Sequence, residues 1–413
     1  MKKIKSILRK LYQLIIMDSL RFCYLLKTKW GDKSKVYKTF SLKNKHVFFG
    51  YYDICPFNKD ETKLLSMVIE RDNSSLNDPF KIDVGYFEIT GNNQEFIKIG
   101  ETNSWCWQQG CRLQWYPLNN AHDFIIYNKL VSNKHGCIIQ NVKTKKIIKE
   151  INFPIYSVTS DGNFGISLNF SRLHRLRPGY GYVNFKDITQ NDPAPVNDGI
   201  KLIDINKGSW KFLFSVKDIT VYKSNLLMEN SIHYFNHVLF NPSGSLFLFF
   251  HIWLKGNKRF VRMLVSDLAG NIKGVFGGDS FVSHYNWRND NEILVYASTK
   301  ESGEAYYLYN VGSGKTEIVG KGILTEDGHP SFLNDNKTIV TDTYPDKYRF
   351  QHLLEYNLDD NRLKVLRKFQ SPLSFKGEVR LDLHPRISPS NKYVCIDFVK
   401  NGKRALNVLL LGK

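Results

Sequence analysis

The sequence predicts an all-β fold, a seven-bladed β-propeller preceded by an N-terminal basic amphipathic helix. Apolar and polar residues alternate from about residue 35 to the C-terminus, which is the period of a β-strand. Short apolar runs, separated by turn signals, form a unit that recurs about every 45 residues, the length of a four-stranded blade. No Pro/Ser-rich linker interrupts this region, so we expect residues 35–413 to form one domain.

Residues 1–34 differ from the rest because their periodicity is helical. Ile4, Leu8, Leu11 and Ile15 recur at helical spacing among basic residues. The longest apolar run, residues 14–17, is too short to span a bilayer or to act as a secretion signal. We expect a basic amphipathic helix that lies on an anionic membrane through residues 1–30, or one that packs across a face of the propeller.

Seven copies of the repeat can be placed along the chain. The clearest four begin at Asn236, His284, His329 and His384, and earlier copies begin near Tyr51, Cys111 and Tyr156. The third copy carries a long insertion between residues 172 and 198. The last copy has room for only three strands before the C-terminus, so a strand at about residues 35–42 is expected to complete it. Such a closure would remove a free sheet edge.

Charge and cysteine content suggest partners and location. The formal net charge of +19 comes from 58 Lys and Arg residues against 39 Asp and Glu residues. This excess favours an anionic partner such as an acidic polysaccharide, although solubility and a Lys-rich sequence bias are the alternative. Because the basic residues are not gathered in a recognition helix, we expect no nucleic-acid partner. The six cysteines form no CxxC pair. We therefore expect a cytoplasmic protein, possibly peripheral at the inner membrane face.

Four histidines occupy equivalent positions in consecutive repeats. His237, His284, His329 and His384 each stand at the beginning of a predicted innermost strand, at one mouth of the central channel. Asp382 precedes His384 by two residues, so both side chains point the same way on an extended strand. Neutral imidazoles that converge with a carboxylate suit a divalent metal. We predict a metal, Mn or Ca, bound by His284, Asp382 and His384, with His329 as a further ligand. An ion pair of Asp382 with Arg380 or Arg386 is the alternative.

The insertion in the third repeat carries a basic cluster. Arg172, Arg175 and Arg177 alternate with apolar residues and precede Tyr180. Guanidinium groups bind carboxylates in a bidentate way, so this cluster could hold an acidic sugar, or it could be a solvated loop. Trp107 could stack on a sugar or belong to an aromatic core. We assign Arg177, Tyr180, Trp107 and Arg380 to substrate binding.

Several motifs resemble the oligogalacturonate lyase family of seven-bladed propellers. These are Asn236-His237 with the later His251, residues 283–287 and residues 384–389. Over nearly the whole chain, the sequence is also similar to uncharacterised propeller proteins encoded among bacterial surface-polysaccharide genes. The shared stretches are residues 50–53, 107–111, 169–180 and 342–346.

The resemblance to the lyase family implies a divalent metal bound by histidines and a glutamine, and a histidine base that acts with an arginine. His284 and His384 would then be metal ligands. One family histidine corresponds to Asp382, and the glutamine has no counterpart.

These observations predict a lyase that cleaves a uronic-acid-containing surface or capsular polysaccharide by β-elimination. The reaction needs a base for the C5 proton and positive charge at the carboxylate. We predict His237 or His251 as the base and Arg172 or Arg175 at the carboxylate. The alternative is a non-catalytic propeller that binds glycan or acts as a scaffold in surface-polysaccharide biosynthesis.

Overall fold

The computed structural model describes residues 34–91, 94–118 and 121–412. The predicted amphipathic helix therefore lies outside the described residues, apart from Ser34. Within the described part of the chain, no helix combines the length and the apolar composition needed to cross a bilayer.

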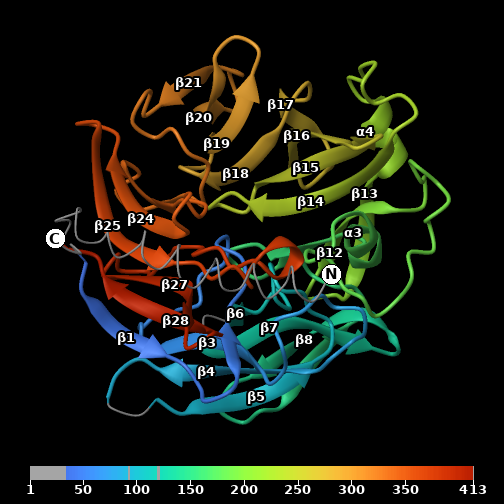
Figure 1. Ribbon diagram of the computed structural model, residues 1–413. Helices are drawn as coiled ribbons and strands as arrows, with labels where there is room; N and C mark the ends of the chain where they lie inside the picture. The colour runs from blue at the N-terminus through green and yellow to red at the C-terminus, as the bar shows by residue number, and fades with distance from the viewer. Residues whose placement is uncertain (1–33, 92–93, 119–120, 413) are drawn as a thin grey trace, which may run out of the picture.

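The described chain forms seven four-stranded antiparallel sheets around a central axis, which confirms the predicted seven-bladed propeller (Figure 1). The first blade contains β2 (His46–Phe48), β3 (Lys63–Ile69), β4 (Ile82–Glu88) and β5 (Phe96–Thr102). The second contains β6 (Gln114–Leu118), β7 (Ala121–Val131), β8 (Lys134–Asn141) and β9 (Ile147–Ile151). The third contains β10 (Ser157–Val158), β11 (Phe164–Ser167), β12 (Gly199–Asp204) and β13 (Ser209–Ser215). The fourth and fifth contain β14 (Ile232–Phe240), β15 (Leu246–Lys255), β16 (Lys258–Asp267) and β17 (Ile272–Gly277); and β18 (Val282–Trp287), β19 (Glu292–Thr299), β20 (Gly303–Asn310) and β21 (Thr316–Val319). The sixth contains β22 (Ser331–Phe332), β23 (Thr338–Asp342), β24 (Phe350–Asn357) and β25 (Arg362–Gln370), and the seventh contains β26 (Arg386–Ile387), β27 (Tyr393–Lys400), β28 (Lys403–Leu410) and β1 (Val36–Phe40).

The seventh blade joins the two ends of the described chain. Its outer strand is β1, which pairs antiparallel with β28 and places Phe40 opposite Leu406. Figure 1 shows this as a blue strand beside the red C-terminal strands. The closing strand predicted at about residues 35–42 lies at Val36–Phe40. The edge of β28 is therefore paired and not open to solvent.

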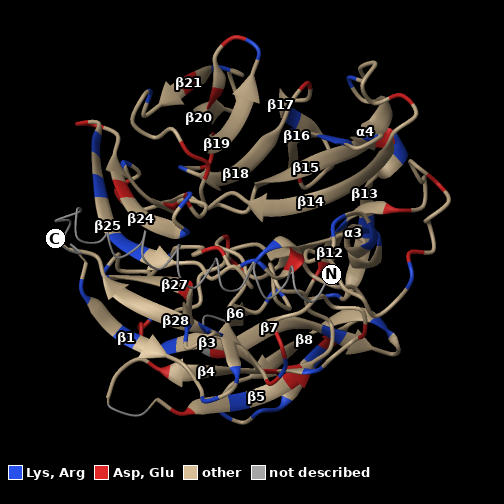
Figure 2. Cartoon of the chain, viewed as in Figure 1, with Lys and Arg blue, Asp and Glu red and all other residues tan. Residues whose placement is uncertain are grey.

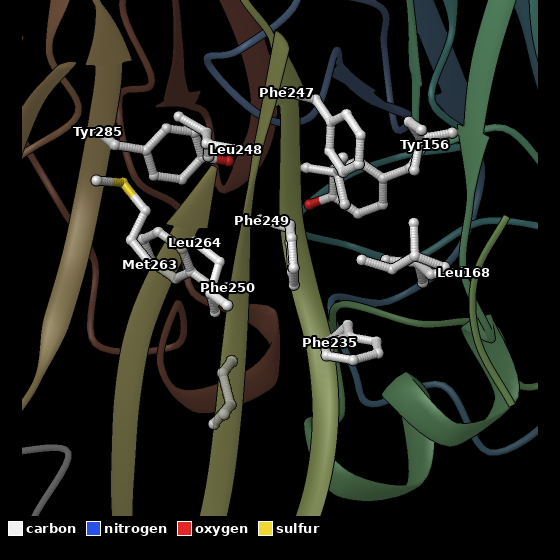
Figure 3. Packing of buried hydrophobic residues seen from close by; sticks show 14 of the residues in the cluster. Tyr156, Leu168, Phe235, Phe247, Leu248, Phe249, Phe250, Met263, Leu264 and Tyr285 are labelled. Carbon is white, nitrogen blue, oxygen red and sulfur yellow. The ribbon is translucent and has the colours of Figure 1, made fainter. Parts of the chain in front are cut away.

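Aromatic and aliphatic side chains fill the space between neighbouring blades. On β15, Phe249 lies toward the third blade, and its ring centroid is 5.7 Å from that of Phe214. Phe250 lies toward the fifth blade, 5.0 Å from Tyr285 (Figure 3). Because β15 is buried on both faces, its apolar residues run almost without interruption. The high aromatic content of the sequence therefore serves largely to pack the blades.

The inner strands are irregular where the repeated histidines stand. The pairing of β14 with β15 breaks between Asn236 and Leu239, and His237 in this bulge has a φ of 54°. His384, just before β26, has a φ of 49°. A left-handed backbone is unfavourable for residues with a side chain, and such strain is common at functional sites. The bulge at His237 and the left-handed backbone at both residues take these histidines out of the regular strand pattern.

The long insertion of the third blade begins with a short helix, α3 (Phe170–Leu176). The Asn169 side chain caps it by accepting hydrogen bonds from the backbone N–H groups of Ser171 and Arg172. A second short helix, α4 (Val216–Val221), follows β13, and a single 3-10 turn, η2 (Gly377–Val379), lies before β26. Figure 2 shows Lys and Arg spread over the ring, including α3 and the outer strands β5 and β25.

Candidate active site

Aromatic rings from five blades gather at the channel mouth. The Tyr51 ring stacks on His237 with a centroid separation of 5.1 Å and meets the edge of His384 at 5.0 Å. The centroids of His284 and His329 are 4.0 Å apart, and those of His329 and His384 are 4.3 Å apart. The structure therefore brings the four predicted histidines together around Tyr51.

Two of these histidines and a carboxylate form a compact cluster of possible metal ligands. One ligand atom each from His329, Asp382 and His384 lies within 4.8 Å of the others, and all three residues are buried. The Nε2 atoms of His329 and His384 have no hydrogen-bond partner among the described residues. Buried nitrogen atoms without a partner are costly, so these two atoms are available to a bound group.

The opposite nitrogen of each imidazole is fixed by the protein. His329 Nδ1 lies 2.8 Å from Asp342 Oδ1, and His384 Nδ1 donates to the Gly50 carbonyl at 2.8 Å. Asp342 also accepts hydrogen bonds from the backbone N–H groups of His329 and His384. Because Nδ1 carries the proton, Nε2 is left with a lone pair, the arrangement usual for metal-binding histidines.

Gly50 is required at its position because two backbones approach closely there. Its φ is 126°, and an added Cβ would lie 2.9 Å from the carbonyl carbon of Gln109. Its carbonyl receives His384 Nδ1 and also Arg386 Nη2, at 3.1 Å. Gly50 thus has a structural role at the site.

The ionisation of the cluster follows from burial and charge. Burial, with the positive charge of its neighbours, lowers the pKa of His384 well below its usual value. Burial also acts on His329, but Asp342 outweighs it and raises the pKa of His329. For Asp382, burial opposes ionisation, but Arg380 outweighs it and lowers the pKa of the carboxyl group. At neutral pH the cluster therefore presents an ionised carboxylate and a neutral His384.

Asp382 belongs to a second chain of contacts as well. Arg380 Nε donates to Asp382 Oδ2 at 2.7 Å, so the alternative ion pair considered for Asp382 is present. Arg380 Nη2 donates to the Tyr180 hydroxyl at 2.6 Å, and the Arg177 guanidinium lies 4.2 Å from the centre of the Tyr180 ring. Burial opposes ionisation of Tyr180, but Arg380 and Arg177 lower its pKa to about 8. Tyr180 thus links the basic insertion to the metal-ligand cluster.

His284 lies beside the cluster and has its own carboxylate. Its Nδ1 is 2.9 Å from Asp327 Oδ1, while Ser283 Oγ donates to Asp327 Oδ2 at 2.6 Å. Burial, the largest cause, lowers the pKa of His284. Its ring touches that of His329, but its nitrogens fall outside the 4.8 Å group. The structure thus places His329 in the cluster and His284 at its border, the reverse of the predicted ranking.

A cavity of about 240 Å³ is lined by His284, whose ring lies against that of His329 in the cluster. It is lined by residues of the third to sixth blades: Arg177, His237, Phe250, Ile252, Arg259, Val261, Phe281, Val282, Ser283, His284, Asp327 and Tyr344. Arg177 and Arg259 both line this cavity, and the positive charge of Arg177, followed by burial, lowers the pKa of Arg259. Neither forms an ion pair with a carboxylate of the described residues. Two neighbouring cations without a counter-ion make this cavity suitable for an anion.

His237 is the histidine of the cavity that has no carboxylate partner. Its backbone N–H donates to the Tyr156 hydroxyl, and its Nδ1 is buried without a partner. Burial, followed by the charge of Arg177, lowers the pKa of His237 well below its usual value. The imidazole is therefore neutral at physiological pH and able to accept a proton.

The structure does not bring His251 to the cavity. Its Nε2 lies 3.0 Å from His233 Nδ1, and its Nδ1 accepts a hydrogen bond from Arg262 Nε at 3.1 Å. Both nitrogens are used and the side chain is fully buried, so His251 cannot be the base.

Arg172 and Arg175 also point away from the cavity. All three guanidinium nitrogens of Arg172 donate to oxygens of Thr189, Asp192, Pro193 and His233. Arg175 Nε pairs with the buried Asp187 at 2.9 Å. Of the basic cluster, Arg177 is the residue that reaches the cavity, as the helix turn directs neighbouring arginines to different sides.

Trp107 belongs to the core, so its assignment to substrate binding is wrong. It is 1% exposed, and its Nε1 donates to the Ser74 carbonyl at 2.8 Å. Its ring packs against Trp105 and beneath the Arg404 guanidinium.

Sequence reasoning missed Asp327, Asp342, Tyr344 and Arg259. Asp327 lies shortly before β22 and Asp342 is the last residue of β23, and only their pairing with histidines shows their role. Arg259 comes from a β-hairpin without any motif, and no sequence pattern distinguishes it.

No family model matches the chain, but solved structures share its fold. Oligogalacturonate lyase in complex with manganese superposes with a TM-score of 0.62 and 14% identity, covering 92% of this chain and 96% of that one. The oligogalacturonate lyase of Vibrio parahaemolyticus superposes with a TM-score of 0.61 and 13% sequence identity, covering 92% of this chain and 98% of that one. At such low identity these likenesses show the shared propeller fold.

One curated protein shares a short stretch with this chain. Dipeptidyl-peptidase 5 of Porphyromonas gingivalis is 34% identical over 69 residues, 15% of this chain and 10% of that protein. The chain thus spans about a tenth of the length of that relative.

Proposed function

We propose that this protein is a divalent-metal-dependent lyase that cleaves a uronic-acid-containing glycan by β-elimination. The observation that carries the proposal is the juxtaposition of two features. The His329, Asp382 and His384 cluster has histidine nitrogens without a partner. His284, whose ring lies against that of His329, lines a cavity together with a neutral histidine and two arginines that pair with no carboxylate of the described residues. Support also comes from the propeller fold, shared with an oligogalacturonate lyase solved with manganese.

The cluster suits a divalent cation by the chemistry of its donors. His329 and His384 would bind it through Nε2, and Asp382 would bind it through a carboxylate oxygen. Imidazole and carboxylate ligands are compatible with Mn²⁺, whereas Ca²⁺ prefers oxygen ligands, so we favour Mn²⁺. When bound, the cation would neutralise the substrate carboxylate and so acidify the C5 proton.

The residues of the cavity then supply the remaining steps. Arg177 and Arg259 bind the uronate carboxylate and exclude a neutral sugar from this position. His237 takes the proton from C5. The electron pair of that C–H bond forms the C4–C5 double bond, and the C4–O bond breaks. Tyr180 contacts Arg177, and Arg380 bonds to both Tyr180 and Asp382, so Tyr180 and Arg380 position Arg177 and Asp382.

The finer identity of the substrate and the location are part of this proposal. We propose a surface or capsular polysaccharide or its fragments as the substrate, and the cytoplasm, peripheral to the inner membrane, as the location. The net charge of +19 supports an acidic polysaccharide as the substrate, and the absence of a CxxC pair among the six cysteines supports the cytoplasm. A glycan-binding or scaffolding propeller is the competing function, and the same experiment separates the two.

The test is an elimination assay that follows the ultraviolet absorbance of the unsaturated product. Purified full-length protein is incubated with polyuronates and surface polysaccharides, with chelator, with Mn²⁺ or with Ca²⁺. We expect a rise in absorbance that chelator abolishes and Mn²⁺ restores. His237→Ala should lower the rate by about 10²–10⁴-fold, the usual contribution of a general base.

The matched control is His352→Gln, since His352 lies in β24 outside the cavity. It should leave the rate unchanged. Full activity of His237→Ala would contradict the assignment of the base. No absorbance change with any acidic glycan would overturn the lyase proposal, and metal-independent binding without turnover would favour the glycan-binding propeller.

A further inference from the structure

The elimination also needs a proton for the departing sugar oxygen, and the residues described so far do not supply one. An alkoxide leaving group is a strong base, so protonation as the C4–O bond breaks lowers the barrier. His237 is occupied with the C5 proton, and the arginines remain protonated while they bind the carboxylate. Another group on the cavity wall can supply this proton.

Two neutral hydroxyl groups line the cavity, those of Ser283 and Tyr344. Ser283 Oγ already donates its proton to Asp327 Oδ2 at 2.6 Å. The Tyr344 hydroxyl makes no hydrogen bond within the described part of the chain, and Tyr344 is only partly buried. Its proton is thus available to a ligand in the cavity.

Tyr344 lies between two hydrogen-bonded aspartates and beside the His329, Asp382 and His384 cluster. Tyr344 follows Asp342, the residue that fixes His329 and His384, by two positions. The loop after it is closed by Asp346, whose carboxylate accepts hydrogen bonds from the backbone N–H groups of Tyr348 and Phe350. The Tyr344 ring lies 5.9 Å from that of His329 and 6.1 Å from that of His284.

Tyr344 and His237 lie on different walls of the cavity. His237 comes from the fourth blade and Tyr344 from the sixth, and residues Val282–His284 of the fifth blade line the wall between them. β-Elimination acts on two adjacent carbons at once, with a base at C5–H and a donor at the oxygen on C4. Two groups on separate walls can serve these two positions.

We propose that Tyr344 is the catalytic proton donor to the departing glycosidic oxygen, an inference that rests on the proposed lyase function. His237 accepts the C5 proton, and the C–H electron pair becomes the second bond between C4 and C5. The C4–O electron pair passes to the departing oxygen, which takes the Tyr344 proton. Water returns a proton to the phenolate, and His237 releases its proton to solvent.

The test compares Tyr344→Phe with the unaltered protein on two uronides that differ only in the group leaving C4. With a sugar as the leaving group, Tyr344→Phe should lower kcat by about 10²–10⁴-fold. With a nitrophenoxy group, which departs without protonation, the loss should be less than tenfold. Tyr285→Phe is the control, because its buried hydroxyl has no partner and does not line the cavity.

The outcomes separate this inference from the lyase proposal. Turnover by the unaltered protein with undiminished Tyr344→Phe activity overturns the inference alone, and so does an equal loss on both substrates, which indicates a binding or structural role. No turnover by the unaltered protein overturns both. If Tyr344→Phe fails to fold, a leaving-group series with the unaltered protein decides: a nearly constant kcat supports the donor, and a steep dependence on leaving-group basicity overturns it.

Discussion

Two arginines five positions apart in the same insertion have opposite roles, and their hydrogen bonds explain why. Arg172 is 2% exposed, and its donors bind the carbonyls that return the insertion to β14. Arg177 ends α3, stacks on Tyr180 and lines the cavity without a carboxylate partner. Arg172 therefore stabilises the fold, while Arg177 is free to bind an anion.

Replacing each arginine by methionine separates the two roles. Arg172→Met leaves several buried oxygens without donors and should lower the free energy of unfolding by about 3 kcal/mol. Arg177→Met should leave that free energy within about 1 kcal/mol and raise KM for an acidic glycan at least tenfold. Urea denaturation and initial rates measure the two effects. Equal destabilisation by both substitutions would contradict this distinction.

The sequence placed Arg172 or Arg175 at the substrate carboxylate, whereas in the structure Arg177 is the arginine of this cluster that lines the cavity. The repeat period located the four histidines because each blade begins at the same depth of the channel. The arginines lie in a non-repeated insertion, where burial depends on the Asn169 cap and on the return of residues 187–193. Such contacts between distant residues have no local sequence pattern.

At the scale of elements, β14, β15 and β16 are joined by a directional chain of side-chain hydrogen bonds. The Met228 carbonyl can only accept, so His233 Nε2 donates to it and His233 Nδ1 must accept from His251 Nε2. His251 Nδ1 in turn accepts from Arg262 Nε. Each imidazole has both nitrogens satisfied only when it is neutral. Protonation of either ring would break the chain.

This chain should make stability depend on pH. Burial, the largest cause, lowers the pKa of His233 to about 4, whereas an unfolded histidine has a pKa of about 6.5. Between these values the unfolded state binds a proton that the folded state does not. Stability is therefore complete above pH 6.5 and falls as pH decreases toward 4, by about 1.4 kcal/mol per unit for this group.

His233→Gln tests the effect, because an amide can donate to Met228 and accept from His251 without titrating. Urea denaturation of both proteins at several pH values between 4.5 and 7 gives the slope of stability against pH. The slope of the variant should be smaller by about 1.4 kcal/mol per unit. The same slope in both proteins would show that His233 is not the titrating group.

The elements themselves were predictable where the sequence is periodic. The spacing of the turn signals predicted the blades, and every blade has four strands. The inner strands β10, β22 and β26 have two residues each, which is too short for a recognisable alternation. Bulges such as the one at His237 shift the register within a strand, so alternation alone misplaces the residues that the channel mouth uses.

At the scale of the whole molecule, the ring is closed by strand pairing between the two ends of the described chain. Each blade packs on its neighbours, so a propeller with a loose seam can open at that seam. The seam of this protein is the contact of β1 with β28, where Phe40 is fully buried and its ring lies 4.9 Å from that of Phe87 in the first blade. Phe40 thus joins the last blade to the first.

Phe40→Ala should weaken this seam before it weakens any other part of the ring. Loss of a fully buried phenylalanine costs about 3–5 kcal/mol through lost burial and the cavity left behind. Hydrogen exchange should show faster exchange for the amides of β28 than for those of β15 and β16 in the fourth blade. Tyr37→Ala, at a position that is 43% exposed in the same strand, is the control and should change exchange little. If the amides of β28 and β15 lose protection from exchange equally, the ring unfolds as one unit. The pairing of β1 with β28 then contributes to global stability and does not open separately.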